Sequence, residues 1–190
     1  MARSVPSLWL VRHGETAWTL SRQHTGRTDL ALTPNGEALA RDVLAAKLAG
    51  VAFDIVLSSP LSRARETARL AGFDPEVDDR LREFDYGDYE GLTTDDIHRR
   101  RPGWDLWTDG CPGGETVEDV GARMDALIAE RLREAGGRAL IFGHGHALRI
   151  LTARWLELPA REGRAFLLAP ATLGITGAEH GRPAIERWGL

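Results

Sequence analysis

The stretch LVRHGET, residues 10–16, takes an apolar run directly into an arginine and a histidine. Leu8–Val11 has the length and composition of a buried strand, so Arg12, His13 and Gly14 follow its carboxyl end. Such an end is either a turn that carries charge or a place where a strand delivers reactive side chains into a pocket. The stretch alone does not separate these two interpretations, and the rest of the chain has to.

Short apolar runs alternate with longer helical patterns along the whole sequence. After a loop that reaches Leu32, we expect helices over 33–48, 59–70, 117–134 and 147–156, and further strands over 53–57, 139–142, 165–168, 173–175 and 184–188. Thr33-Pro34, Ser59-Pro60 and Thr116 supply the helix starts. This alternation predicts a three-layer α/β/α sandwich whose central sheet is mostly parallel and carries antiparallel strands at one edge.

Length and composition limit the class of protein. A chain of 190 residues that is 43% hydrophobic, without a recognisable linker, fits one domain over 1–190. The sequence has no apolar run of about 18 residues and no signal-like N-terminal segment, so we expect neither a membrane partner nor secretion. A net charge of −4 disfavours nucleic acid as a partner, and the single cysteine, Cys111, fits the reducing cytoplasm.

Polar groups follow the carboxyl ends of three predicted strands. They are Arg12-His13-Gly14, Ser58-Ser59-Pro60 with Arg63 beyond it, and Gly143-His144-Gly145-His146. In open α/β sheets, ligands bind beyond these strand ends, and we therefore expect the three segments to form one site. Arg63 lies one turn into its helix and could fold back over the helix N-terminus, which attracts anions.

Two chemistries could use the strand-end histidines. A metal could be bound by His13, His144 and His146, but arginines lie nearby and the sequence has no HxxxH pair, cysteine pair or HxHxD pattern, so we expect no metal and no cofactor. The alternative is phosphoryl transfer through histidine. Phosphate charge is stabilised mainly by fixed cations, and arginine suits this role because its planar group grips two oxygens.

Five stretches resemble, in the same order, the motifs of a known family. LVRHGETAW, HTGRTDLALTPNGEALA, SSPLSRARETA, LREFDYGDYEGLT and GHGHALR, which span Leu10 to Arg149, are similar to successive motifs of the histidine phosphatase superfamily, whose fold is phosphoglycerate mutase-like. DYGDYEGLT, WDLWTDGCPGGET and GHGHALR most resemble the sedoheptulose-1,7-bisphosphatase-like branch, which includes broad-specificity phosphatases.

The resemblance implies a role for each matching residue. His13 would attack phosphorus and become a phosphohistidine, with its other ring nitrogen donating to a backbone carbonyl. Arg12, Arg63 and a protonated His144 would surround the phosphoryl oxygens. Glu83 would protonate the leaving oxygen and then deprotonate the attacking water.

The resemblance also implies secondary contacts with substrate. These are the hydroxyl of Thr25 and the N–H of Gly26, main-chain donors at Gly145 and His146, Ser59 as a helix cap or a substrate contact, Tyr86 in the pocket wall, and Thr19, which replaces the asparagine usual in mutase-like members.

The length of one insertion separates the candidate reactions. Mutases of this family carry a longer basic insertion, whereas about thirty residues lie between Glu83 and Thr116, which predicts a small cap at about 84–115. Thr94 stands where mutases have lysine. We therefore expect hydrolysis of a small phosphorylated metabolite, a sugar phosphate or bisphosphate. The alternatives are a phosphoglycerate-type mutase, a protein phosphatase acting on phosphohistidine or phosphotyrosine, and a non-catalytic binding module. A homodimer is expected by analogy alone.

Overall fold

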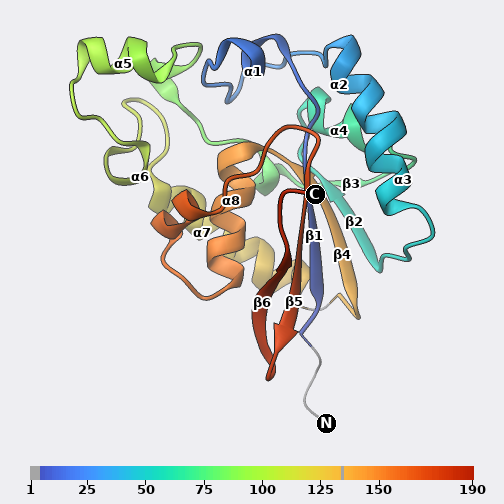
Figure 1. Cartoon of the computed structure of the whole chain (residues 1–190). Coiled ribbons are helices and arrows are strands. Elements are labelled where there is room, and N and C mark those ends of the chain that lie inside the picture. The colour runs from blue at the N-terminus through green and yellow to red at the C-terminus, as the bar shows by residue number, and fades with distance from the viewer. Residues whose placement is uncertain (1–4, 134) are drawn as a thin grey trace.

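A six-stranded sheet in the order β3-β2-β4-β1-β5-β6 runs through the centre of the computed structural model, which describes residues 5–133 and 135–190 (Figure 1). The strands are β1 (Ser7–Arg12), β2 (Ile55–Ser58), β3 (Glu76–Val77), β4 (Arg138–Gly143), β5 (Leu173–Glu179) and β6 (Arg182–Arg187). The first four are mutually parallel, while β5 is antiparallel to both β1 and β6. The predicted mixed sheet with an antiparallel edge is confirmed.

Helices cover both faces of this sheet. The segments are α1 (Ala17–Ser21), α2 (Pro34–Ala38), α3 (Ala45–Leu48), α4 (Ser62–Leu70), α5 (Thr94–Arg100), α6 (Leu106–Asp109), α7 (Val117–Leu127) and α8 (Gly145–Trp155), with π-helical continuations at Leu39–Leu44 and Ile128–Leu132. Figure 1 shows α2, α3 and α4 on one side and α7 and α8 on the other. Each side buries its own apolar cluster against the sheet, which gives the predicted three layers.

The helix starts follow from local chemistry. Thr33 accepts a hydrogen bond from the Gly36 N–H, and Pro34 occupies the first helical position. Thr116 and Asp119 form a reciprocal capping box at the start of α7. The long helix expected to reach Glu134 remains helical to Leu132, and Glu134 itself lies outside the described residues.

Three helices or strands differ from the sequence-based expectation. The expected loop to Leu32 contains α1, because Thr16 and Thr19 form an unrecognised capping box. Strand β3 has only two residues, both exposed, so the sequence contains no apolar run that would predict it. Helix α4 starts at Ser62 rather than near Ser59, because the Ser59 N–H extends the sheet by bonding the Phe142 carbonyl at 3.0 Å.

The expected strand over 165–168 is wrong. Residues Ala160–Ala165 form a 3₁₀ helix, and the backbone beyond them is irregular. The carbonyls of this segment accept hydrogen bonds from arginine side chains instead of a neighbouring strand. Arg149 bonds the carbonyls of Gly163 and Arg164, and Arg12 bonds that of Leu168.

The insertion expected at about 84–115 carries α5, α6 and a 3₁₀ turn at Gly87–Tyr89. In Figure 1 it lies beyond the sheet, at the same end of the molecule as α1. A bridge between Gln23 and Thr93 joins it to the loop that follows β1. The insertion therefore covers the strand ends where the site was expected.

Candidate active site

Sheet order alone brings the three expected segments together. Strands β2, β4 and β1 are neighbours, and their registers align Ser58 with Phe142 and Arg12 with Gly143. The residues that follow these strand ends, Ser59, His144 and His13, therefore lie at one edge of the sheet. The rings of His13 and His144 are 5.1 Å apart between their centroids.

His13 is held with one ring nitrogen free. Its backbone N–H donates to the Gly143 carbonyl at 2.9 Å, which continues the sheet by one residue. Its Nδ1 lies 2.7 Å from the Gly14 carbonyl, which can only accept, so Nδ1 carries the hydrogen and Nε2 keeps its lone pair. Burial, together with the charges of Arg12 and Arg63, holds the pKa of His13 well below its usual range. The ring is thus neutral and nucleophilic at Nε2.

Two buried arginines lie close enough to influence that histidine. Arg63 is completely buried and is fixed by the carbonyls of Thr28, Thr25 and Gly26 at 2.8, 3.2 and 3.0 Å. Arg12 donates to the carbonyl of Leu168 at 2.7 Å. Each guanidinium group keeps its Nε buried and without a partner in the part of the chain that the structure describes.

Unpartnered buried donors cluster around this site. Within residues 5–133 and 135–190, four buried side-chain nitrogens lack a hydrogen-bond partner, and three of them belong to Arg12, Arg63 and His144. A buried polar group without a partner is costly and rare, so these atoms indicate a bound partner rather than a packing defect. Two cations and a ring nitrogen call for an anion that accepts several hydrogen bonds.

The N-terminus of α4 is not part of this anion site, contrary to expectation. Asp29, from the loop before α2, accepts hydrogen bonds from both the N–H and the hydroxyl of Ser62, at 2.9 and 2.8 Å. A carboxylate already satisfies the positive end of the helix dipole there. Arg63 acts through its own buried charge, with Asp29 only 4.0 Å from its NH1.

His144 differs from the expected protonated state. Burial is the main cause that holds its pKa well below the usual range, and the charge of Arg63 adds to the effect, so the ring is neutral. Its Nε2 lies 2.7 Å from the hydroxyl of the fully buried Ser59. When that hydroxyl donates to Nε2, the hydrogen sits on Nδ1, the atom that has no partner in the described residues. A neutral His144 can then still donate to an anion.

Ser59 therefore has a different role from helix cap or substrate contact. Its hydroxyl accepts the Leu61 N–H at 3.3 Å, and when it donates to His144 its one hydrogen is already used within the protein. The capping position of α4 is Leu61, without a side-chain cap. Ser59 orients the histidine rather than the ligand.

Glu83 is fastened to the start of α8. Its two carboxylate oxygens accept the backbone N–H groups of His146 at 3.1 Å and Ala147 at 2.8 Å, and also that of Phe84 at 2.8 Å. The N–H groups of His146 and Ala147 belong to the first turn of α8, where no helical carbonyl is available to accept them. The His146 N–H, which was expected to donate to substrate, thus donates to Glu83. Gly145, the other expected main-chain donor, is the first residue of α8 and directly follows His144.

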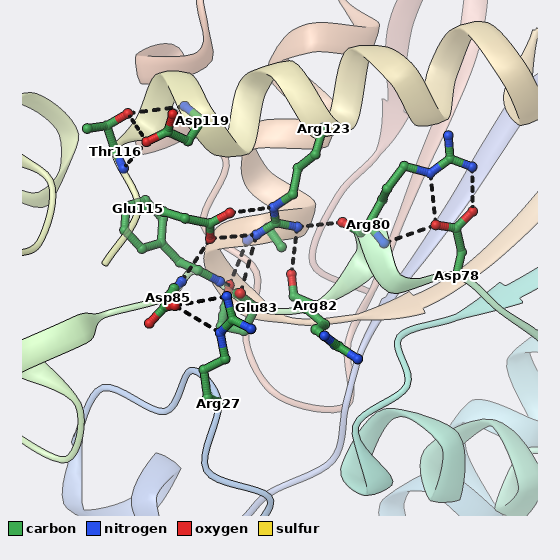
Figure 2. A network of polar contacts seen from close by, with 12 residues as sticks. Arg27, Asp78, Arg80, Arg82, Glu83, Asp85, Glu115, Thr116, Asp119 and Arg123 are labelled. Atoms are coloured by element: carbon green, nitrogen blue, oxygen red, sulfur yellow. Dashed lines mark hydrogen bonds and ion pairs between the residues drawn. The ribbon is translucent and has the colours of Figure 1, made fainter. Parts of the chain in front are cut away.

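A second arginine network, which sequence reasoning missed, holds the segment that carries Glu83. Figure 2 shows Arg123 reaching from α7 to this backbone, where it bonds the carbonyls of Arg80, Arg82 and Glu83, the last two at 2.8 and 3.3 Å. Glu115 pairs with Arg123 at 2.9 Å and accepts the Asp85 N–H. No local sequence pattern predicts these contacts, because Arg123 looks like any other arginine in a helix.

A cavity of about 250 Å³ opens in front of His13. Seven of the expected residues besides His13 line it: Arg12, Thr19, Thr25, Glu83, Tyr86, Gly145 and His146. Residues that sequence reasoning did not single out complete the wall: Trp18, Arg22, Gln23, His24 and Arg149. Arg63, His144 and Ser59 lie deeper and do not line it. A larger hollow of about 410 Å³ between α2 and α4 reaches Arg63 but contains no histidine.

Several secondary contacts are engaged within the protein. The Thr19 hydroxyl donates to the Thr16 carbonyl at 2.8 Å, and Thr25 donates to the Gln23 carbonyl at 3.2 Å. The Tyr86 hydroxyl lies 2.6 Å from Nδ1 of His146. All three side chains nevertheless border the cavity.

The expected phosphate contact from Gly26 is not present in this structure. The Gly26 N–H donates to both carboxylate oxygens of Glu90, each at 3.0 Å. A side chain at this position would meet the Phe84 carbonyl at 2.5 Å, so glycine serves close packing between the loop and the cap. Its carbonyl, which bonds Arg63, is the link to the site.

The described residues contain neither a metal-binding cluster nor a membrane-spanning helix. No cluster of three or more His, Cys, Asp or Glu side chains with metal-binding geometry occurs in residues 5–133 and 135–190. Over the same described ranges, no helix combines the length and apolarity needed to span a bilayer.

The molecule is an α/β protein whose strand ends carry a buried neutral histidine and unpartnered arginine nitrogens, an arrangement suited to an anion. The profile described as "Histidine phosphatase superfamily (branch 1)" matches residues 8–190. The chain belongs to the histidine phosphatase superfamily, and it is a phosphatase enzyme of that superfamily.

Relatives of established description agree with this assignment. An "Acid phosphatase" of Mycobacterium tuberculosis is 45% identical over 188 residues, covering 96% of this chain and 92% of the relative. A "Sedoheptulose 1,7-bisphosphatase" of Saccharomyces cerevisiae is 37% identical, covering 83% and 70%. A solved structure of an open reading frame from Mycobacterium tuberculosis superposes with a TM-score of 0.91 at 43% identity, covering 97% of both chains.

Proposed function

We propose that this protein is a metal-independent phosphomonoesterase that hydrolyses a small phosphorylated metabolite through a phosphohistidine on His13. One observation carries the proposal. His13 presents a neutral Nε2, fixed by the 2.7 Å contact of Nδ1 with the Gly14 carbonyl, beside arginines whose Nε atoms lack partners among the described residues. A nucleophile and the counter-charges for a phosphoryl group thus occupy one place.

The first step transfers the phosphoryl group to the enzyme. Nε2 of His13 attacks phosphorus, a P–N bond forms, and the bond from phosphorus to the leaving oxygen breaks. A protonated Glu83 gives its proton to that oxygen, and the carboxylate it leaves is stabilised by the N–H groups of His146 and Ala147. Arg12 and Arg63 hold the phosphoryl oxygens during the transfer.

The second step releases inorganic phosphate. Glu83 takes a proton from a water molecule, whose oxygen attacks phosphorus while the P–N bond breaks, and His13 recovers its lone pair. The reaction takes its charge stabilisation from side chains of this chain, so the proposal expects activity to persist in the presence of a chelator.

The size of the cavity favours a small substrate over a phosphorylated protein. A volume of about 250 Å³ behind the cap suits a metabolite of sugar-phosphate size. The relatives named acid phosphatase and sedoheptulose 1,7-bisphosphatase support hydrolysis of a phosphate ester. A phosphomutase remains the second candidate, and it is disfavoured because Thr94 stands where mutases have lysine.

The buried free Cys111, whose pKa burial raises to about 12, is compatible with the cytoplasm as the proposed location.

The test is a comparison of the wild-type enzyme with His13→Ala. Wild type should release inorganic phosphate from phosphate esters without a bisphosphate primer, and acid-labile, base-stable label should be trapped on the protein from ³²P-substrate. His13→Ala should do neither. Equal hydrolysis by both proteins, or primer-dependent isomerisation with little free phosphate, would overturn the proposal.

A further inference from the structure

The cavity in front of His13 opens toward a second hollow. This outer hollow, of about 510 Å³, shares His24 and His146 with the inner cavity. Its other lining residues come from the cap: Thr94, His98, Gly103, Trp104, Asp105, Leu106 and Trp107. A group attached to a phosphate at His13 can therefore extend past these two histidines into the cap.

The two hollows differ in charge. Arg12, Arg22 and Arg149 line the inner cavity, and none of them forms an ion pair with a carboxylate of the described residues. No arginine or lysine is among the described residues that line the outer hollow. Its one carboxylate, Asp105, is turned to the start of α6, where it accepts the Trp107 N–H at 3.0 Å. A second phosphate would find no arginine or lysine among these lining residues.

The two histidines that both hollows share, His24 and His146, behave as neutral rings. Burial lowers the pKa of His24, although Glu90 opposes the shift. Burial also holds the pKa of His146 well below its usual range, with the charge of Arg149 as a further cause. Neutral imidazoles can donate or accept one hydrogen bond and can stack, which suits hydroxyl groups and ring faces rather than anions.

The aromatic wall is already in place. The His24 ring packs against Tyr86 at a tilt of 38°, with 4.7 Å between centroids, and its backbone is bonded to Leu92 and Gly91 of the cap. Trp104 donates from its indole N–H to the Gly110 carbonyl at 2.8 Å. Trp107 is covered on one side by the guanidinium of Arg149, 4.5 Å from the ring centroid. Because these side chains are already fixed, they lose little conformational entropy when a ligand binds.

We infer that the outer hollow is the subsite for the leaving group and that it takes an uncharged ring, either a pyranose or a planar heterocycle. The inference rests on the proposed function, because it places the phosphate at His13. It narrows the substrate to a phosphate monoester with one uncharged, ring-bearing end, and it excludes a second anion from the cap.

A filling substitution tests the subsite. Thr94 is exposed, begins α5 and lines the outer hollow, so Thr94→Trp should narrow it without disturbing the core. Thr108 is equally exposed on α6 and does not line either hollow, and Thr108→Trp is the matched control. The readout is the ratio of kcat/KM for a ring substrate to that for the acyclic glycerol 3-phosphate, with glucose 6-phosphate and adenosine 5′-monophosphate as the two ring arms.

Thr94→Trp should lower this ratio about tenfold or more for whichever ring the hollow accepts, while Thr108→Trp leaves it at the wild-type value. Wild type should also prefer that ring substrate to fructose 1,6-bisphosphate, and Thr94→Arg, which adds a cation to the hollow, should reduce that preference. An unchanged ratio in Thr94→Trp, or wild-type preference for glycerol 3-phosphate or the bisphosphate over both ring substrates, overturns the inference. These results are separable from failure of the proposed function, which would appear as hydrolysis that survives His13→Ala.

Discussion

The contact between Ser59 and His144 yields the sharpest prediction. Both side chains are fully buried, and 2.7 Å separates the hydroxyl from Nε2. Ser59→Ala removes the group that selects the His144 tautomer and leaves Nε2 buried without a partner, which should cost about 1–3 kcal/mol of unfolding free energy. Without this orientation Nδ1 no longer donates reliably to the phosphoryl group, and loss of one such donor should lower kcat about 100-fold.

The neighbouring serine is a matched control. Ser58 is also fully buried, but its hydroxyl donates only to the Ser59 carbonyl, at 3.0 Å. Ser58→Ala should lose about 1 kcal/mol of stability with little change in kcat. The assays are urea unfolding, steady-state kinetics and inhibition by vanadate, which should weaken in Ser59→Ala. If both variants lost stability equally and kept wild-type kcat and vanadate affinity, Ser59 would be a packing residue and the argument would be refuted.

Three further predictions follow from the site. Arg123→Met should lower the unfolding free energy by about 2–4 kcal/mol, because the carbonyls of Arg82 and Glu83 and the Glu115 carboxylate lose a charged donor. The kcat should also fall as Glu83 shifts. A destabilised variant with unchanged kcat would contradict the role of Arg123 in positioning Glu83. Gly145→Ala would place Cβ 3.2 Å from Cζ of Arg12, so vanadate affinity should drop about tenfold while thermal stability holds; unchanged affinity would show that Arg12 can move freely. The pKa values of the buried site histidines are lowered in the folded protein, so below about pH 6.5 the unfolded chain binds protons that the folded chain does not. The stability they contribute is complete above that pH and should fall as pH decreases, by about 1.4 kcal/mol per pH unit for each ring. A flat unfolding free energy between pH 7 and pH 5 would contradict this prediction.

Sequence patterns predicted what depends on near neighbours along the chain. The apolar run before Arg12 and the alternation of strands and helices gave the sheet, since burial imposes a period on each element. Caps such as Thr33 and Thr116 use partners three residues away and were visible for that reason. The short helix α1 was missed although Thr16 and Thr19 form the same kind of cap, because threonine rarely takes the glutamate position.

The sequence by itself determined most of the sheet, the polar strand ends and the residues that we propose as the nucleophile and its counter-charges. Tertiary structure alone decided how those groups are charged and connected. Asp29 closes the N-terminus of α4, Glu90 takes the Gly26 N–H, and burial makes His144 neutral. These contacts join residues 33 and 64 positions apart, and burial depends on the whole packed molecule. Desolvation and long-range hydrogen bonds exist only once the chain has folded, so no local pattern carries them.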